Sequence, residues 1–555
     1  MADVVDRRLG LLFAGFLVLL GLASTQALRL AIVNGSKLSS DAAAQQVALA
    51  TIPARRGTIV DRHGIDLAVS QPAADVAADP YLISDPDAEA PKLATVLDIP
   101  VATLVIKLAR RNTGFVYLAR RVTAARAAQI KALKLPGITL TASQRRVYPR
   151  SWMASQVLGM VGVDGTGLSG LEYYDNKLLA GHDGLQRTVN DAAGQQIEVT
   201  DPRAAIPGAR LELNLDSPIQ DKAEQVLQQV GATYRPKDAT AIVMDPRDGE
   251  LLAVANWPAT NANDPAGAPA SALQDRATGF DYEPGSTFKA FTVAGALTDG
   301  AVTPDTSFNL PPVLQVADRQ IHDDEARGWV TLTTAQILSQ SSNIGAITIA
   351  RRLGSARLSA WIQRFGFGAP TGVDLPGEEQ GIVPPLRKWS GSSIGNIPIG
   401  QGISVTPMQI AAAYAAIANG GILRSPQMVR RINGQLVPRP RGHRVISGHV
   451  AAELRHMLEG VLAPGGTAAE VSIPGYQLAG KTGTANKVDP KTGEYSDSAY
   501  VTSFVGFAPA DHPKLLVSVM VDEPQGGSIS GGQVAAPAFQ KIAQFALPYL
   551  RIPPS

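Results

Sequence analysis

A serine and a lysine stand three residues apart in Ser286-Thr-Phe-Lys289, a spacing that could support nucleophilic catalysis. The turn formers Pro284 and Gly285 precede this pair and the apolar segment 290–297 follows it, which predicts that Ser286 lies at or near a helix N-terminus. Residues i and i+3 share one helical face, so the lysine amine can reach the serine hydroxyl. An adjacent amine with a lowered pKa can act as the base that activates a serine.

Two more polar segments follow and supply the other groups that acyl transfer needs. Ser341-Ser-Asn343 offers a second hydroxyl that can carry protons and an amide that can hold a peptide bond. Lys481 offers a positive charge for a substrate carboxylate, and Gly483 leaves room for substrate against a strand edge, where a backbone N–H can stabilise an oxyanion. Each segment alone could be a helix-flanking polar pair or a glycine turn. Together, and in this order, they indicate an acyl-serine enzyme.

Two other motifs fit different chemistry but lack the structural context it requires. Gly475–Thr482 matches the phosphate-loop pattern, which must join a buried strand to a helix, yet Pro474 precedes it and the polar turn Asp489–Gly493 soon follows. Gly391–Gly395 matches the pattern of a hydrolase nucleophile elbow, but Pro384-Pro385 leads into it where a strand is needed. We therefore expect neither nucleotide binding nor an elbow serine.

The chemistry-bearing residues fall in a region with predicted strands at both of its ends. The strand patterns are Ala239–Met244 and Leu251–Ala255 before them, and Ser503–Phe507 and Leu515–Val521 after them. Helical patterns dominate from Lys289 to Phe365. Strands at both ends with helices between them predict an α+β fold, in which one antiparallel sheet is covered by helices.

The composition narrows the class of protein. The chain has 555 residues, so its length predicts several domains. Its net charge of +2 gives no reason to expect a nucleic-acid partner. It has no cysteine, and its seven histidines show no metal-ligand spacing, so we expect neither a disulfide framework nor metal catalysis.

The N-terminal segment determines the expected location. Arg7-Arg8 precedes Leu9–Leu28, a mostly apolar stretch of about the length needed to cross a bilayer core. The paired arginines favour a cytoplasmic N-terminus. A cleaved signal peptide is the competing interpretation, because Thr25 and Ala27 are small enough for a cleavage site. We favour an uncleaved anchor because apolar residues resume at 30–33, and we expect nearly all of the chain outside the cytoplasmic membrane.

A break in the pattern separates two domains after the anchor. Pro207-Gly208 ends a region of mixed short strands and helices, and Leu211–Leu215 then alternates as a strand should. We predict a cytoplasmic tail over 1–8, an anchor over 9–32, a first domain over 33–207 and a large domain over 208–550.

The three polar segments resemble the active-site set of penicillin-binding proteins, and the likeness to the class B members covers nearly the whole chain. Three segments of the first domain resemble motifs of that family's non-catalytic pedestal: Arg56–Gly64, Arg146–Pro149 and Gly167–Glu172. Three segments of the second domain resemble the division-type, septal FtsI-like branch: Tyr282–Ser286, Gly400–Pro407 and Gly532–Pro537. The chain therefore resembles a septal D,D-transpeptidase.

The departures from the family pattern lie in the pedestal. His63 stands where Asn is usual, Arg150-Ser151 replaces a pair that usually ends in Gly, and Gln156 stands where His is common. These differences bear on contacts with partners and not on the chemistry.

The resemblance implies a fold and a mechanism. The fold is a penicillin-binding transpeptidase domain, with an antiparallel sheet flanked by helices, behind a transmembrane helix and an elongated α+β pedestal. Ser286 would attack the carbonyl between the last two D-alanines of a peptidoglycan stem peptide while Lys289 takes its proton. Ser341 would relay a proton to the leaving amine, and Asn343 would hold the stem-peptide amide. The other implied groups are the backbone N–H groups of Ser286 and Thr484 as oxyanion hole, and Lys481, Thr482, Gly483 and Thr484 around the terminal carboxylate.

The resemblance also implies partners. An amine from a neighbouring stem peptide would attack the acyl-enzyme and close the cross-link, and β-lactams would trap the same serine. No metal or organic cofactor is implied. The anchor and pedestal would contact a SEDS-type glycosyltransferase of the FtsW kind and other divisome membrane proteins at the division septum.

Other functions remain open at this stage. An elongation-type relative would share the chemistry but have a different partner. A carboxypeptidase or β-lactamase would pass the acyl group to water. A scaffold or β-lactam sensor would not turn over a peptide substrate. The complete set of motifs argues against a scaffold, and the anchor with its pedestal argues against a β-lactamase, which needs neither.

Overall fold

The structure is a computed structural model that describes residues 2–32, 47–190, 196–439, 441–489 and 491–554. It divides into two compact units. The first unit comprises Met1–Arg55 and Gly181–Pro207, and the second comprises Arg56–Ala180 and Gly208–Ser555.

The first unit holds the N-terminal helix and a small sheet. Helix α1 (Ala2–Ile32) contains the apolar span Leu9–Leu30, which is long and apolar enough to cross a membrane. This span fits the predicted single-pass anchor. The sheet is antiparallel, with strand order β1-β6-β7: β1 (Val47–Ile52), β6 (Gly184–Asn190) and β7 (Gln196–Arg203).

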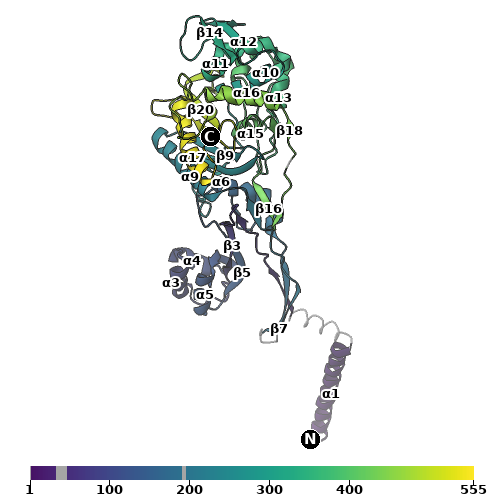
Figure 1. The fold of residues 1–555 in the computed structure, drawn as a ribbon. Helices are drawn as coiled ribbons and strands as arrows, with labels where there is room; N and C mark the ends of the chain where they lie inside the picture. The colour runs from purple at the N-terminus through teal and green to yellow at the C-terminus, as the bar shows by residue number, and fades with distance from the viewer. Residues whose placement is uncertain (1, 33–46, 191–195, 440, 490, 555) are drawn as a thin grey trace. The chain divides into compact units, whose positions relative to one another are not determined.

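The central sheet of the second unit has five antiparallel strands in the order β10-β9-β21-β20-β19 (Figure 1). They are β9 (Asp238–Asp245), β10 (Glu250–Trp257), β19 (Ala479–Val488), β20 (Tyr495–Ala508) and β21 (Leu515–Asp522). The prediction of one antiparallel sheet built from both ends of the large domain is confirmed. Strand β19 lies at one edge of this sheet.

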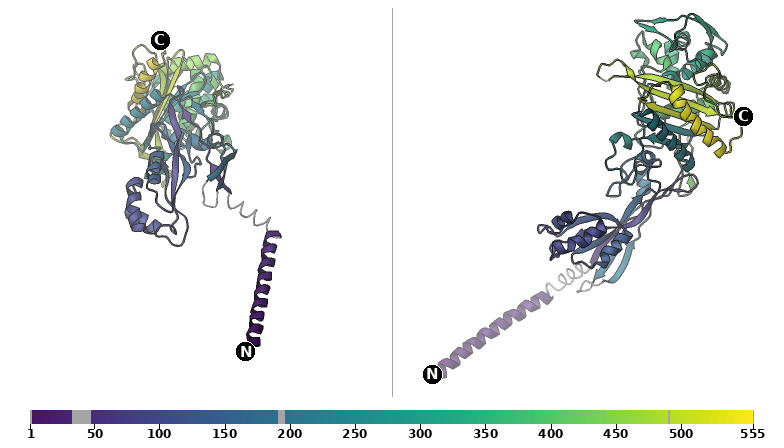
Figure 2. Two further views of the ribbon diagram at one scale, coloured as in Figure 1. Left: turned by 90° about the horizontal axis from the view of Figure 1, so that it is seen from below. Right: turned by 90° about the vertical axis from the view of Figure 1, so that its left-hand side faces the viewer.

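Helices cover both faces of this sheet, which is why β21 is buried along its whole length and its neighbour β9 nearly so. Helices α9 (Ser217–Tyr234) and α17 (Gly531–Tyr549) pack against the strands and against each other, and Figure 2 shows α17 lying across the strands. Helix α15 (Pro407–Ala418) is buried along its whole length between strands β9, β20 and β21 and helix α16 (Gly448–Glu459).

A second sheet in this unit joins segments that are far apart in the sequence. Its order is β17-β16-β8-β2-β3-β4, with β5 paired to β3. The strands are β2 (Ile59–Val60), β3 (Asp66–Ala78), β4 (Val116–Thr123), β5 (Ile138–Val147), β8 (Leu211–Leu213), β16 (Val429–Ile432) and β17 (Gln435–Leu436). Three helices share a small apolar core with β3, β4 and β5: α3 (Pro86–Leu97), α4 (Val101–Leu108) and α5 (Ala124–Ala132).

The prediction that helices dominate 289–365 holds for four helices: α10 (Lys289–Thr298), α11 (Thr334–Ser339), α12 (Asn343–Leu353) and α13 (Ser355–Arg364). It is wrong for 307–333, where four strands form two short ladders: β11 (Ser307–Leu310) with β14 (Val330–Thr333), and β12 (Leu314–Val316) with β13 (Arg319–Ile321). Strands of three or four residues are too short to show a period of two.

One buried carboxylate joins the three segments that resemble pedestal motifs. Glu172 is fully buried, and its two oxygens accept hydrogen bonds from Arg56 Nε and Arg146 Nε, both at 2.6 Å. Arg56 also donates to the backbone carbonyl of Glu172 at 2.8 Å, and Arg146 donates to the Gly57 carbonyl at 2.7 Å. The three segments therefore form one structural site, because two buried guanidinium groups share a single counter-charge.

Replacing Glu172 with Ala is expected to destabilise this region strongly. The change leaves two buried cations unpaired, and breaking a buried pair in this way costs about 3–5 kcal/mol. The thermal-unfolding midpoint of the full chain in detergent should fall by several degrees. Arg357→Ala is the control, because it removes a long 3.8 Å ion pair with Asp299 in which the arginine is 62% exposed, and its effect should stay within about 1 kcal/mol. Equal midpoints for the two variants would contradict this account.

Candidate active site

The predicted nucleophile lies on a tight turn that leads into a buried helix. Residues Gly285–Phe288 form a 3₁₀ turn, and α10 begins directly after it at Lys289, so the predicted helix N-terminus is confirmed. Gly285 has φ +54°, and a Cβ there would lie 2.7 Å from the carbonyl oxygen of Thr484. Glycine is thus required at this position for two reasons: the left-handed backbone conformation and the close approach of strand β19.

The second polar segment forms the start of helix α12. Ser342 is its N-cap, and the Ser342 hydroxyl accepts a hydrogen bond from the Gly345 N–H at 3.0 Å. Ser341, one residue earlier, has φ +59°, a conformation that costs a non-glycine residue about 1–2 kcal/mol. This backbone places the carbonyl of Ser341 next to the Lys289 amine, at 2.5 Å.

The two predicted lysines meet at the Ser341 hydroxyl. Lys289 Nζ donates to Asn343 Oδ1 at 2.6 Å and to Ser341 Oγ at 3.2 Å. Lys481 Nζ reaches the same Oγ at 2.9 Å from strand β19. The structure therefore brings Lys289, Ser341, Asn343 and Lys481 into one hydrogen-bonded network, directly after the turn that carries Ser286.

Ser286 itself is half-buried and takes no part in that network. Among the residues that the structure describes, its hydroxyl makes no hydrogen bond, although Lys289 is only three positions away. The expected serine–lysine contact is therefore replaced by contacts of Lys289 with Ser341 and Asn343. In this arrangement the hydroxyl of the predicted nucleophile is unbonded, and the amine of its predicted base donates to three acceptors on Ser341 and Asn343.

Burial controls the charge of both lysines. It lowers the pKa of Lys289 to about 8, an effect that the carboxylates of Asp324 and Asp323 partly oppose. Burial and the neighbouring Lys289 also hold the pKa of Lys481 well below its ordinary value, and Asp324 again opposes the shift. The site therefore resists holding two ammonium groups, and a carboxylate arriving beside Lys481 would favour the charged form.

The third polar segment lies on the edge strand β19, close to the serine turn. Thr482 Oγ1 pairs with Thr467 Oγ1 at 2.7 Å, and Thr484 Oγ1 accepts from the Gly531 N–H at 3.2 Å. The segment is therefore on an edge strand, as the predicted substrate position requires. The structure gives a further reason for glycine at 483, because a Cβ there would lie 2.4 Å from Ser503 Oγ and 2.9 Å from the Pro284 carbonyl.

Sequence reasoning missed two acidic residues next to this network. Asp323 accepts hydrogen bonds from the Ser342 hydroxyl and the Ile344 N–H, and Asp324 accepts from Asn343 Nδ2 at 3.2 Å. They lie between β13 and β14, in the region where short strands were not predicted. No motif or spacing marks them in the sequence.

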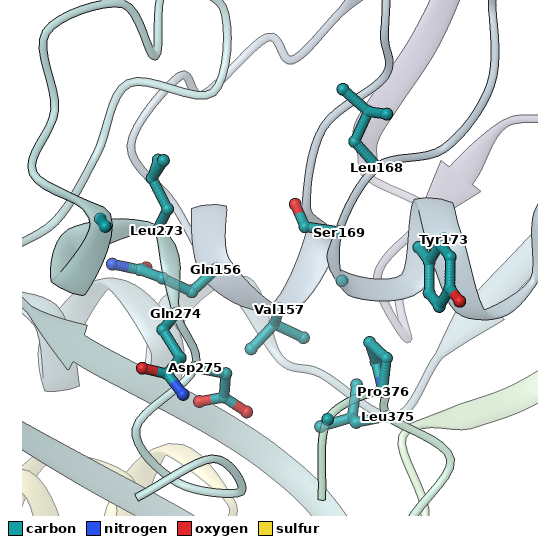
Figure 3. A pocket seen from close by; sticks show the side chains of 13 residues that line it. Gln156, Val157, Leu168, Ser169, Tyr173, Leu273, Gln274, Asp275, Leu375 and Pro376 are labelled. Atoms are coloured by element: carbon teal, nitrogen blue, oxygen red, sulfur yellow. The ribbon is translucent and has the colours of Figure 1, made fainter.

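A cavity of about 420 Å³ lies elsewhere in the second unit, and none of the predicted site residues lines it (Figure 3). Its wall combines Gln156 and Val157 of the short helix α6 (Ser155–Leu158) with Tyr173 and, from the other side, Leu375 and Pro376. This wall is mainly apolar. It contains one serine, Ser169, and no lysine or histidine that could act as its base, so the cavity does not fit acyl transfer.

Two family models match the chain. The model described as penicillin binding protein transpeptidase domain matches residues 239–544, and the penicillin-binding protein dimerisation domain matches residues 51–213. All eight predicted site residues lie within the first match.

The chain is also similar to two penicillin-binding proteins along nearly its whole length. It is 33% identical to the peptidoglycan D,D-transpeptidase FtsI of Escherichia coli, with 100% of this chain and 93% of that protein covered. It is 34% identical to the penicillin-binding protein PbpB of Mycobacterium tuberculosis, with 97% and 84% covered. The crystal structure of penicillin-binding protein 3 from the same organism, complexed with aztreonam, matches with a TM-score of 0.72 and 30% identity over 91% of this chain and 98% of that one.

Proposed function

This chain belongs to the class B penicillin-binding proteins and is a peptidoglycan D,D-transpeptidase, and we propose that Ser286 is its acyl-accepting nucleophile. The observation that carries the proposal is the single network of Lys289, Ser341, Asn343 and Lys481 beside the Ser286 turn. A D-Ala-D-Ala stem peptide is the substrate, and β-lactams react with the same serine. Strand β19 and the largely buried helices α10 and α12 position these residues.

In the acylation step Ser286 Oγ attacks the carbonyl carbon of the penultimate D-alanine, and its proton passes to Lys289. The backbone N–H groups of Ser286 and Thr484 stabilise the oxyanion, and removing one such donor typically costs about 3–4 kcal/mol. The C–N bond then breaks, and Ser341 delivers a proton to the departing D-alanine amine. Ser341 is suited to this relay because its hydroxyl contacts both lysines.

The remaining residues bind the substrate. Asn343 holds the stem-peptide amide, while Lys481, Thr482 and Thr484 hold the terminal carboxylate, and Gly483 allows β19 to approach the serine turn. An amine of a neighbouring stem peptide then attacks the acyl-enzyme, releases Ser286 and forms the cross-link. Neither step needs a metal or an organic cofactor.

The rate of acylation should depend on pH through Lys289. Only the neutral amine can accept the serine proton, and the pKa of Lys289 is about 8. The second-order rate constant for acylation by a fluorescent penicillin should therefore rise about tenfold per pH unit below pH 8 and level off above it. A rate that is flat from pH 6 to pH 9, or that falls with rising pH, would contradict a base at this position.

Transfer to an amine separates the transpeptidase from a hydrolase. The full chain in detergent should release D-alanine from a D-Ala-D-Ala pentapeptide and, with a D-amino acid as acceptor, form the exchange product. Release of D-alanine with no exchange product at any acceptor concentration would support the carboxypeptidase alternative and contradict transfer of the acyl group to an amine.

We further propose that the chain is divided into a cytoplasmic tail (1–8), an anchor (9–32), a pedestal (33–207) and a transpeptidase domain (208–550).

We also propose a role at the division septum. The similarity to FtsI of Escherichia coli over the whole chain supports this role. A SEDS-type glycosyltransferase would contact the anchor helix and the pedestal. A fluorescently tagged copy should gather at division sites, whereas signal along the lateral wall would favour the elongation-type alternative. Co-isolation of the glycosyltransferase after removal of both segments would contradict the proposed contact.

A further inference from the structure

A loop that precedes the second polar segment makes direct contact with it. The loop spans residues 322–327, between β13 and β14, and contains the consecutive acids Asp323 and Asp324. Asp323 bonds the N-cap hydroxyl and a backbone N–H at the start of α12, whereas Asp324 bonds the Asn343 side chain. Its oxygens lie 2.9 and 3.0 Å from the Ser342 hydroxyl, and Oδ1 also accepts from the Ile344 N–H at 3.0 Å.

These contacts brace a strained turn. Ser342 links Asp323 to the helix. Its hydroxyl also accepts a hydrogen bond from the Gly345 N–H and so joins Asp323 to the first turn of α12. The carboxylate faces a helix N-terminus, where a negative charge is favourable. Asp323 therefore holds the residues on the C-terminal side of Ser341, whose φ of +59° aims its carbonyl at Lys289.

Asp324 acts on the neighbouring side chain. The Asn343 Nδ2 group donates to Asp324 Oδ1 at 3.2 Å and to the His322 carbonyl at 3.0 Å. Both amide N–H bonds are thus directed to the loop, which turns Oδ1 toward Lys289 Nζ at 2.6 Å. A carbonyl oxygen has a second lone pair, so Asn343 Oδ1 in this orientation can also accept a hydrogen bond from a stem-peptide N–H.

We propose that Asp323 and Asp324 are positioning residues for acylation: Asp323 fixes the Ser341–Asn343 turn, and Asp324 fixes the Asn343 amide. The proposal rests on the proposed function, because it concerns the geometry of that reaction. Neither acid touches Ser286 or needs to touch the substrate. Both act through Ser341, Asn343 and Lys289.

The charges around the lysines predict distinct effects for the two acids. Lys289 is faced by Asp323, Asp324 and Arg327 from the loop and by Lys481 from β19. Asp324 is the carboxylate that most strongly favours the charged form of Lys289. Removing its charge should lower the pKa of Lys289 further, whereas removing Asp323 should chiefly release the turn.

Acylation of the full chain in detergent by a fluorescent penicillin, measured from pH 6 to pH 9, tests both roles. In Asp324→Asn the inflection near pH 8 should move to lower pH. In Asp323→Asn the rate constant should fall roughly 10- to 100-fold at every pH, since a hydrogen bond to a charged group is lost at a buried turn. The control is Glu325→Gln, which removes an exposed carboxylate from the same loop and should leave rate and inflection unchanged.

The labelling results distinguish a failure of the positioning role from a failure of the proposed function. An unlabelled wild type would refute the proposed function itself. A labelled wild type with an unmoved inflection in Asp324→Asn and an unchanged rate in Asp323→Asn would overturn only the positioning role. If Asp323→Asn loses its cooperative unfolding transition, the inflection of Asp324→Asn still decides, because a merely structural loop contact would not shift a pKa.

Discussion

Replacing Ser286 with Ala should abolish covalent labelling by a fluorescent penicillin. Among the described residues the Ser286 hydroxyl makes no hydrogen bond, whereas the Ser341 hydroxyl accepts from both Lys289 and Lys481. Loss of a nucleophilic serine that acts with its base as a unit costs on the order of 10⁶-fold in rate. The variant should therefore show no labelled band after hours of incubation, while its unfolding midpoint stays near that of the wild type.

Ser393→Ala is the matched control for this experiment. Ser393 lies in the segment Gly391–Gly395 that matches the pattern of a nucleophile elbow. The structure places it at the start of the short helix α14 (Ser393–Asn396), where its hydroxyl accepts from the Ser390 N–H. This variant should be labelled at the wild-type rate. Equal labelling of wild type and Ser286→Ala, or loss of labelling only in Ser393→Ala, would refute the assigned nucleophile.

Replacing Lys289 with Met should slow acylation by about 10²- to 10⁴-fold, the usual contribution of a positioned general base. Methionine has a similar length and no charge, so the buried space stays filled while the amine is lost. The residual reaction should no longer show an inflection near pH 8. Stopped-flow or gel-based labelling from pH 6 to pH 9 measures both effects.

Lys541→Met is a suitable control for the lysine variant. Lys541 lies on α17, and its amine bonds the Gln229 side chain at the surface. Its labelling rate and pH profile should match the wild type. A Lys289→Met protein that keeps the wild-type inflection would show that a different group accepts the serine proton.

Local patterns in the sequence predicted the elements that carry the site. A proline and a glycine before an apolar run specify a turn and a helix, so the position of Ser286 before α10 followed from neighbouring residues alone. Short, mostly apolar runs specified β9, β10, β20 and β21, and the fold class followed from their order along the chain. These features depend on few residues that are close in the sequence.

Contacts between distant segments were not predictable in the same way. The i, i+3 spacing placed Lys289 beside Ser286, but the buried amine instead bonds Ser341 and Asn343, which come from a distant part of the sequence. The close approach of the Pro284 carbonyl and Ser503 to Gly483, which leaves no room for a Cβ, also could not be foreseen. Asp323 and Asp324 could not be found, because the short strands that place them carry no periodic signal.

The most direct test of the account is to locate the acyl group. The full chain is reacted with a penicillin, digested, and mapped by peptide mass spectrometry. The account predicts one adduct per chain, on the hydroxyl of Ser286, and no adduct in Ser286→Ala. An adduct on any other residue, or an unmodified peptide containing Ser286 in fully labelled protein, would contradict it.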